Sequence, residues 1–209
     1  MVRELIRHDP DEPVKWRHYT IANVMRRLTY HKFNSLLGEN LNKSLNSEDS
    51  KEEVTEQDLV TLLDQQDQNS MLFTVKNYRR ESCVSEKFFR KSGAIELEVK
   101  GPMGKGLQAE KTGCHVAFAA GTGVLTFMDL VAHIAAHNLG YSERLGVNPD
   151  DCIQPGFKLI LHLSYARKED TIGLELCNKL NKFCKANNFD NFELYVRITK
   201  ENLNPARWD

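Results

Sequence analysis

The chain has 209 residues, a length that suits one medium-sized domain or two small ones. Hydrophobic residues make up 41% of it and charged residues 27%, with 28 basic against 29 acidic side chains. This is the composition of an ordinary globular protein, and the balanced charge argues against nucleic acid as a partner. No apolar run approaches the roughly 18 residues of a membrane-spanning helix, so we expect no transmembrane segment.

The first residues, MVRELIRHDPDEP, lack the apolar core of a secretory signal peptide and are more acidic than a typical transit peptide. The chain has five cysteines, an odd number, mostly in apolar or helical contexts: Cys83, Cys114, Cys152, Cys177 and Cys184. Reduced thiols explain this pattern better than disulfides. We therefore expect an intracellular protein, either cytoplasmic or mitochondrial.

The N-terminal part of the chain predicts a short strand followed by an acidic insertion. Residues 14–23, VKWRHYTIAN, have the pattern of a strand or an extended segment. The following residues mix helical and loop patterns, and between Ser47 and Asp67 eight acidic side chains accompany one basic side chain, Lys51. We interpret residues 24–70 as an acidic, partly flexible insertion. The alternative is an element that docks on a partner.

Two alternating segments then predict strands, and a glycine-rich loop follows them. Residues 71–78 (MLFTVKNY) and 94–101 (AIELEVKG) alternate apolar and polar side chains, as a half-buried strand does. The sequence GPMGKG (101–106) is too rich in glycine and proline for regular structure.

From Cys114 onward the pattern alternates between strands and helices. The predicted strands are Val116–Ala119, Phe157–Leu163 and Phe192–Ile198, and the predicted helices are Phe127–Leu139, which ends at Gly140, and Glu169–Asn187. Such alternation indicates a parallel sheet covered by helices.

A turn of small residues, Ala120–Gly123, joins the first of these strands to its helix. Free backbone N–H groups and the positive end of the helix dipole meet at such a junction, which suits a pyrophosphate. The alternative is that the glycines only allow tight packing of helix on strand.

Three segments, in chain order, resemble the ferredoxin-NADP reductase superfamily. RHYT (Arg17–Thr20) resembles the family's R-x-Y-[ST] strand. SCVS (Ser82–Ser85) resembles G-x-[VM]-S with serine in place of the glycine, and GPMGKGL (101–107) resembles the end of the family's barrel. AAGTGVLTFMDL (119–130) resembles G-G-T-G-[IV]-x-P-[FM], with Ala120 and Thr126 replacing a glycine and the proline.

This resemblance implies a fold and two cofactors. Residues 1–107 would form a partial antiparallel flavin-binding barrel, and residues 108–209 a truncated Rossmann-like parallel α/β half-domain for NAD(P)H. The resemblance assigns FAD to Arg17, Tyr19, Thr20 and Ser85, and the phosphates of NAD(P)H to Gly121, Thr122 and Gly123. SYARKED (164–170) is similar to the family's second strand-to-helix junction, near the adenosine, and Lys200 follows the third strand where relatives select the 2′-phosphate.

The complete cofactor-binding domains of the family contain strands and a motif that this sequence lacks. Most barrel strands of the family precede the R-x-Y-[ST] strand, whereas 16 residues precede Arg17 here, and the chain contains no Cys-Gly-Pro motif. We therefore expect a reductase-like oxidoreductase subunit completed by partner chains, with an electron-carrier protein as a further partner. The alternative is a non-catalytic accessory subunit, a pseudoenzyme that keeps the reductase-like scaffold in a larger complex.

Three further patterns have simpler interpretations. GPMGKG lacks the spacing and the Ser or Thr of a P-loop. His133 and His137 lie four apart on one predicted helix without the Glu of a zinc protease, so we expect no metal site. A basic patch is predicted to be a solvated face or a contact for an acidic carrier protein or a cofactor phosphate: Arg79, Arg80, Lys87, Arg90 and Lys91.

Overall fold

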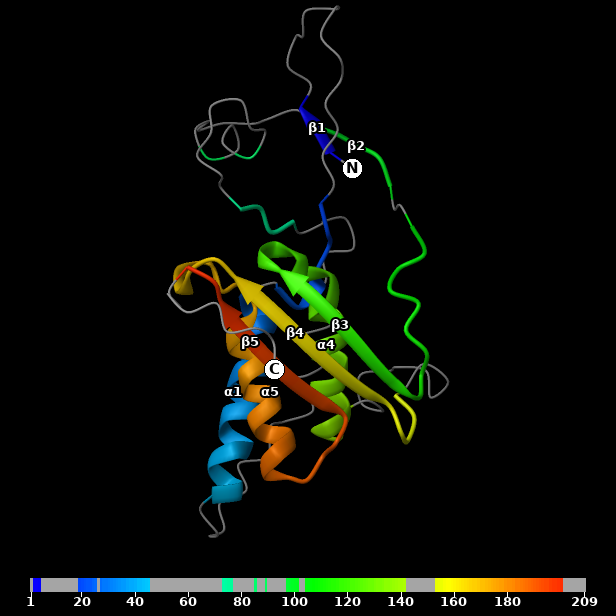
Figure 1. Cartoon of the computed structure of the whole chain (residues 1–209), viewed down its shortest axis with the longest axis vertical. Helices are drawn as coiled ribbons and strands as arrows, with labels where there is room; N and C mark the ends of the chain where they lie inside the picture. Colours follow the sequence, from blue (N-terminus) through cyan, green and yellow to red (C-terminus); the bar gives the residue numbers. More distant parts are fainter. Residues whose placement is uncertain are drawn as a thin grey trace, which may run out of the picture. The chain divides into compact units, whose positions relative to one another are not determined.

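The computed structural model of the chain describes residues 2–4, 19–25, 27–45, 73–76, 85, 89, 97–101, 104–141 and 153–200 (Figure 1). The chain divides into two compact units, and each is described by itself below. Unit 1 comprises Met1–Ile21 and Phe73–Gln108, and unit 2 comprises Ala22–Leu72 and Ala109–Asp209.

Unit 2 contains a parallel three-stranded sheet, which confirms the predicted α/β class. Its strands are β3 (Cys114–Ala120), β4 (Lys158–Tyr165) and β5 (Phe192–Ile198), in the spatial order β3-β4-β5. Ala117 lies opposite Leu161, which in turn lies opposite Leu194. The strand β5 has the predicted bounds, whereas β3 begins two residues earlier and β4 ends two residues later than expected.

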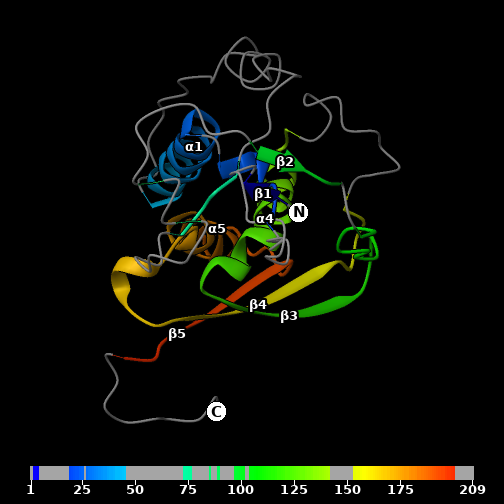
Figure 2. The same cartoon turned by 90° about the horizontal axis from the view of Figure 1, so that it is seen from above.

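The helices of unit 2 cover one face of this sheet (Figure 2). The helices α4 (Leu125–Asn138) and α5 (Leu174–Ala186) lie against the sheet, and α1 (Arg27–Leu45) packs on α5 farther from the strands. None of the helices in the part of the chain that the structure describes lies on the other face of the sheet.

The core of unit 2 fills the space between the sheet and the helices. Every second side chain of β4 points toward the helices, as the alternation along a strand requires. These are Leu159, Leu161, Leu163 and Tyr165, each at most 1% exposed. They meet fully buried side chains of α4 and α5: Met128, Val131, Ile134, Leu176 and Leu180.

The region before α5 corrects the predicted helix Glu169–Asn187. A 3-10 turn, η4, spans Lys168–Asp170, and α5 begins only at Leu174. Gly173 precedes it with φ of 73°, a left-handed conformation that interrupts the helix. A Cβ atom at Gly173 would also lie 2.7 Å from the Sδ atom of Met128, so the glycine lets α5 approach α4 closely.

The predicted end of α4 at Gly140 is confirmed. Gly140 has φ of 76°, and its N–H donates to the carbonyl oxygen of His137 at 3.0 Å. The N–H of Tyr141 donates to the carbonyl oxygen of Ala136 at 2.8 Å. These two bonds form a Schellman motif, which satisfies carbonyl groups that the helix leaves open.

The segment expected as an insertion of the barrel begins with a helix that belongs to unit 2. Leu36 and Leu37 of α1 are buried, and the Nζ atom of Lys179 on α5 donates to the carbonyl oxygen of Asn34 at 3.1 Å. Because α1 packs on α5, residues 27–45 are part of the α/β unit and not of the N-terminal one. Residues 46–70 lie outside the described residues.

Unit 1 contains short antiparallel pairings among its described residues. The strand β1 (Val2–Glu4) pairs with β2 (Leu97–Val99), and an isolated antiparallel bridge joins Ile21 to Phe73. Half of the predicted strand at 71–78 lies outside the described residues, and in the described half, 73–76, Phe73 makes this bridge. An antiparallel barrel therefore stays a prediction for this unit.

None of the described helices combines the length and the apolar content that crossing a membrane requires.

Candidate functional site

The glycine turn between β3 and α4 is the candidate site in unit 2. Ala120, the last residue of β3, has an extended backbone (φ −119°, ψ 130°), and the 3-10 turn η2 (Gly121–Val124) leads directly into α4. Gly121 has φ of 53°, in the left-handed region that glycine adopts without strain. The chain therefore passes from β3 into α4 through this four-residue turn, with no irregular residue between them.

The space around this turn bears on the interpretation that its glycines serve tight packing. A Cβ atom added at Gly121 or at Gly123 would find no heavy atom within 4 Å. Gly173 shows what a packing glycine looks like in this fold, since its added Cβ would collide with Met128. Tight packing of helix on strand therefore does not explain Gly121 and Gly123, and the positive φ of Gly121 is itself a reason for glycine there.

The electrostatics of the turn favour an anion. The first N–H groups of a helix have no partner within the helix, and the helix dipole places partial positive charge there. Gly121 and Thr122 are half-buried and Gly123 is exposed, whereas Val124 and Leu125 beneath them are buried in the core. The buried side chains of Val124 and Leu125 thus anchor the turn in the core, while Gly123 is accessible to solvent.

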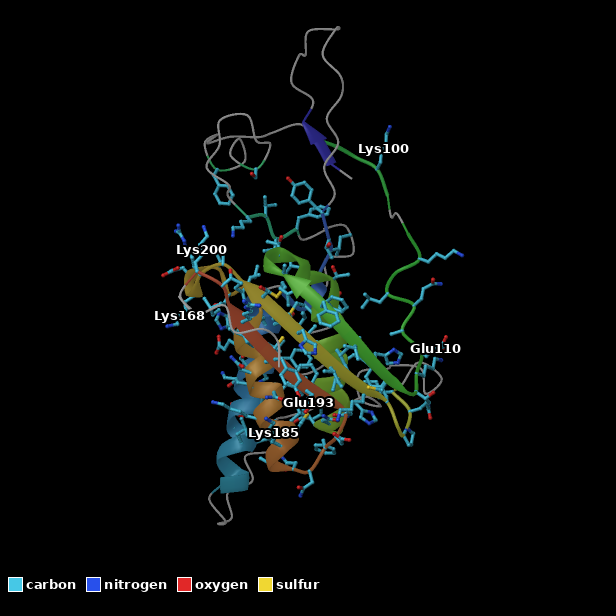
Figure 3. All side chains as sticks on the ribbon, viewed as in Figure 1. Lys100, Glu110, Lys168, Lys185, Glu193 and Lys200 are labelled. Carbon is cyan, nitrogen blue, oxygen red and sulfur yellow. The ribbon has the colours of Figure 1, made fainter. Side chains whose placement is uncertain are left out.

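Basic residues follow the neighbouring strands at the same edge of the sheet. The carboxyl ends of parallel strands meet at one edge, where ligands of α/β proteins bind. Two backbone bonds hold the segments after β4 and β5 together: Thr199 N–H to Tyr165 O at 2.8 Å, and Lys200 N–H to Ala166 O at 3.0 Å. Figure 3 shows Lys168 and Lys200 near each other at this edge. The basic residues at this edge are Arg167, Lys168, Arg197 and Lys200, and they are accompanied by Glu169 and Asp170.

An aspartate on α4 fixes the chain that enters unit 2. The Oδ1 atom of Asp129 accepts a hydrogen bond from the N–H of Val24 at 2.9 Å. Val24 lies in the 3-10 turn η1 (Asn23–Met25) and is 3% exposed, so this N–H is removed from water. Local sequence patterns do not predict this contact, because its partners lie 105 positions apart in the chain.

Three of the predicted flavin ligands, Tyr19, Thr20 and Ser85, lie among the described residues of unit 1. Arg17 lies outside the described residues. Tyr19 is half-buried, and its ring meets the ring of Phe73 edge to face, with centroids 6.2 Å apart. Thr20 is exposed, and Ser85 is buried with 6% of its surface exposed. The three predicted NAD(P)H ligands, in contrast, lie together in one turn of unit 2.

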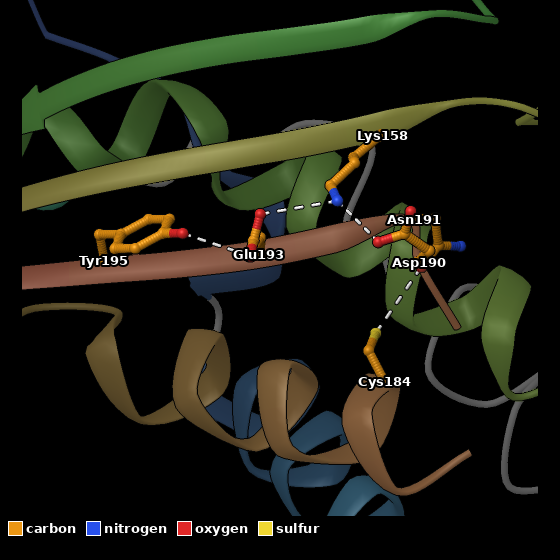
Figure 4. Close-up of polar contacts among 6 residues, drawn as sticks. All are labelled: Lys158, Cys184, Asp190, Asn191, Glu193 and Tyr195. Carbon is orange, nitrogen blue, oxygen red and sulfur yellow. Dashed lines mark hydrogen bonds and ion pairs between the residues drawn. The ribbon is translucent and has the colours of Figure 1, made fainter. Parts of the chain in front are cut away.

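A polar groove of about 390 Å³ lies at the opposite, amino edge of the sheet. The Nζ atom of Lys158 contacts Oδ1 of Asp190 at 2.6 Å and Oε2 of Glu193 at 3.6 Å (Figure 4). The hydrogen bond to Asp190 raises the pKa of Lys158. Beneath it, the side-chain amides of Asn138 and Asn191 donate to each other at 2.9 and 2.6 Å. These contacts join β4, α4 and the start of β5, and we interpret them as structural.

The other patterns that the sequence singled out form no second site among the described residues. Within the described ranges, no group of three or more His, Cys, Asp and Glu residues could hold a metal ion. His133 is half-buried and His137 is exposed on α4. Gly104 and Gly106 of the former P-loop candidate are exposed, with φ of 84° and 75°. The basic residues between Arg79 and Lys91 lie outside the described residues.

Two comparisons, with protein-family models and with curated proteins, found no match for this chain. No protein-family model matches it, and no curated protein matches it at a significant level. The resemblance to the ferredoxin-NADP reductase superfamily therefore depends on the sequence motifs alone.

Proposed function

We propose that the chain is a ferredoxin-reductase-like subunit that binds NAD(P)H at the glycine turn of unit 2. The open turn from Gly121 to Gly123, with room above both glycines, is the observation that carries this proposal. A pyrophosphate would accept hydrogen bonds from the amides of this turn, and the hydroxyl of Thr122 adds a further donor.

The basic edge of the sheet supports NADPH over NADH. In sheets of this topology an acidic residue near the second strand binds the ribose 2′-hydroxyl of NADH, whereas an arginine accommodates the 2′-phosphate of NADPH. Here Arg167 and Lys168 follow β4 directly, and Lys200 is held beside them by its backbone bond to Ala166. Glu169 and Asp170 lie at the same edge, but the basic residues there outnumber them by four to two, and we propose NADPH as the preferred nucleotide on this balance of charge.

The proposal extends to FAD in unit 1. Arg17, Tyr19, Thr20 and Ser85 are its proposed ligands, of which Arg17 would pair with the pyrophosphate and Tyr19 would lie against the ring. When bound, FAD would supply the hydride and electron chemistry. Partner chains would complete the subunit, and an electron-carrier protein would receive the electrons.

NADPH binding tests the nucleotide part of this proposal. A ligand that binds only the folded state raises the unfolding temperature, so we expect NADPH to raise it and NADH to raise it less. Gly123→Ala should fold normally, because its φ is ordinary and its Cβ has room, yet it should weaken NADPH binding about tenfold or more, since it obstructs charge-assisted hydrogen bonds. Gly38→Ala on α1, where a Cβ also has room, is the matched control and should bind NADPH normally.

A second candidate function is that of a non-catalytic accessory subunit. The uncovered face of the sheet favours it, because Phe118 is 70% exposed there and Tyr195 is 44% exposed, and such apolar surface suits contact with another protein. The visible absorption spectrum of the purified protein separates the two candidates. A flavin band of nearly stoichiometric amplitude supports the redox subunit, whereas no flavin and no effect of NADPH on unfolding supports the accessory role.

A further inference from the structure

Within the part of unit 2 that the structure describes, the strand β3 is an edge of the sheet. Among the described residues it pairs with β4 alone. A free strand edge presents unpaired backbone N–H and C=O groups, which can bind a further strand. Most proteins block such an edge with charged side chains, proline or a bulge.

The hydrogen bonds between β3 and β4 determine which residues of β3 point their backbone N–H and C=O groups away from β4, toward the edge of the sheet. Gly113 exchanges both of its bonds with the β4 side: its N–H donates to Gly156 O at 3.1 Å, and its carbonyl accepts from Lys158 N–H at 2.9 Å. Backbone groups alternate between the two sides of a strand, so His115, Ala117 and Ala119 also bond toward β4. The outward groups therefore belong to Cys114, Val116, Phe118 and Ala120.

The same four residues place their side chains on the uncovered face. Val116 is 56% exposed and Phe118 is 70% exposed. Phe118 stacks on His162 of β4 with ring centroids 4.8 Å apart and an interplanar angle of 16°. Since one face of the phenyl ring contacts β4, its other face is turned toward the free edge.

The edge of β3 carries no blocking feature. Its sequence, CHVAFAA, contains no Lys, Arg, Asp, Glu or Pro. The opposite edge strand, β5, carries Glu193 and Arg197. The contrast indicates that β3 is the edge that accepts another strand.

We infer that β3 pairs with β3 of a second copy of this chain, antiparallel and across a two-fold axis at Ala117, to form a continuous six-stranded sheet. This register sets Val116 opposite Phe118 of the second copy, and Cys114 opposite Ala120. All four outward residues of each copy then form hydrogen-bonded pairs, and each exposed phenyl ring covers an exposed valine. This pairing of the two sheets does not depend on whether unit 2 binds a nucleotide.

The oligomeric state without nucleotide tests this inference. We expect sedimentation of the purified chain over a range of concentrations to approach the mass of two chains. Val116→Pro removes an N–H that points away from β4, so it should leave the fold intact and raise the dimer dissociation constant at least tenfold. Phe118→Lys, at an exposed position, should do the same and serves if the proline variant fails to fold.

Tyr195→Lys is the matched control for contact through the open face. Tyr195 lies on that face but on β5, two strands away from the free edge, and it is 44% exposed. Edge pairing predicts that this variant dimerises as the wild type does.

Disulfide formation tests the register. Opposite residues of a hydrogen-bonded antiparallel pair have Cα atoms about 5.5 Å apart, which suits a disulfide. Ala120→Cys should therefore form a covalent dimer with the native Cys114 on oxidation. The double variant Ala120→Cys with Cys114→Ser should not.

Three results would overturn the inference. One is a chain that stays monomeric at all concentrations, and another is a dimer that Val116→Pro and Phe118→Lys both leave unchanged. The third is a dimer that Tyr195→Lys abolishes, because that result would move the contact from the strand edge to the sheet face.

Discussion

At the scale of single residues, burial determines the chemistry of the cysteines. Cys177 and Cys184 of α5 are both 0% exposed, and burial raises the pKa of each thiol to about 12. A buried protonated thiol is neither a nucleophile nor a metal ligand. Cys114 at the start of β3 is exposed. The prediction of reduced thiols is consistent with these three free cysteines.

Alkylation of the folded protein checks this difference among the thiols. At about pH 8.5 and with excess iodoacetamide, we expect Cys114 to be modified at least tenfold faster than Cys177 and Cys184, because only thiolates react and the buried thiols stay protonated. Peptide mass spectrometry reads each site separately, and the same reaction in denaturant is the control. Equal modification of Cys177 in the folded state would contradict the burial of α5 against the sheet.

At the scale of elements, one hydrogen bond ties the entry of unit 2 to α4. Asp129→Ala leaves the buried N–H of Val24 without its acceptor and should lower the free energy of unfolding by about 1–3 kcal/mol. Asp129→Asn keeps an acceptor oxygen and should retain most of the stability. Urea unfolding of both variants measures the difference. If both lose the same amount, the carboxylate stabilises the fold through its charge and not through this bond.

Local sequence patterns predicted those strands and helix ends of unit 2 that depend only on neighbouring residues. The alternation in β4 and the glycine after α4 are visible in a few neighbouring residues. The start of α5 was wrong by five residues, because its helical periodicity extends back to Ile172 while Gly173 interrupts the backbone. The packing of α1 on α5 was also missed, since which helix covers which is a contact between distant segments.

At the scale of the whole molecule, sequence order alone located the glycine turn at the carboxyl edge of a parallel sheet. A motif of small residues between a strand and a helix was sufficient for this prediction. The room above Gly121 and Gly123, which argues against tight packing, required the three-dimensional structure, and the nucleotide itself stays a prediction. The flavin ligands of unit 1 stay a prediction, since their assignment came from the resemblance.

The sheet of unit 2 is covered by helices on one face only, among the residues that the structure describes (Figure 2). Parallel sheets are ordinarily buried on both faces, whereas Phe118 and Tyr195 are exposed on this one. The partner chains proposed for the subunit would cover this face, whereas the proposed dimer, paired through the edge of β3, leaves it open.

The most direct test of the nucleotide proposal is the response of individual backbone amides to NADPH. Heteronuclear NMR of the protein labelled with ¹⁵N resolves the amides of the turn and of the helix that follows it. We predict that NADPH, and also ADP as a pyrophosphate probe, shifts the resonances of Gly121, Thr122 and Gly123 far more than those of Gly104 and Gly106. Unchanged resonances at the turn with millimolar NADPH would contradict the proposal.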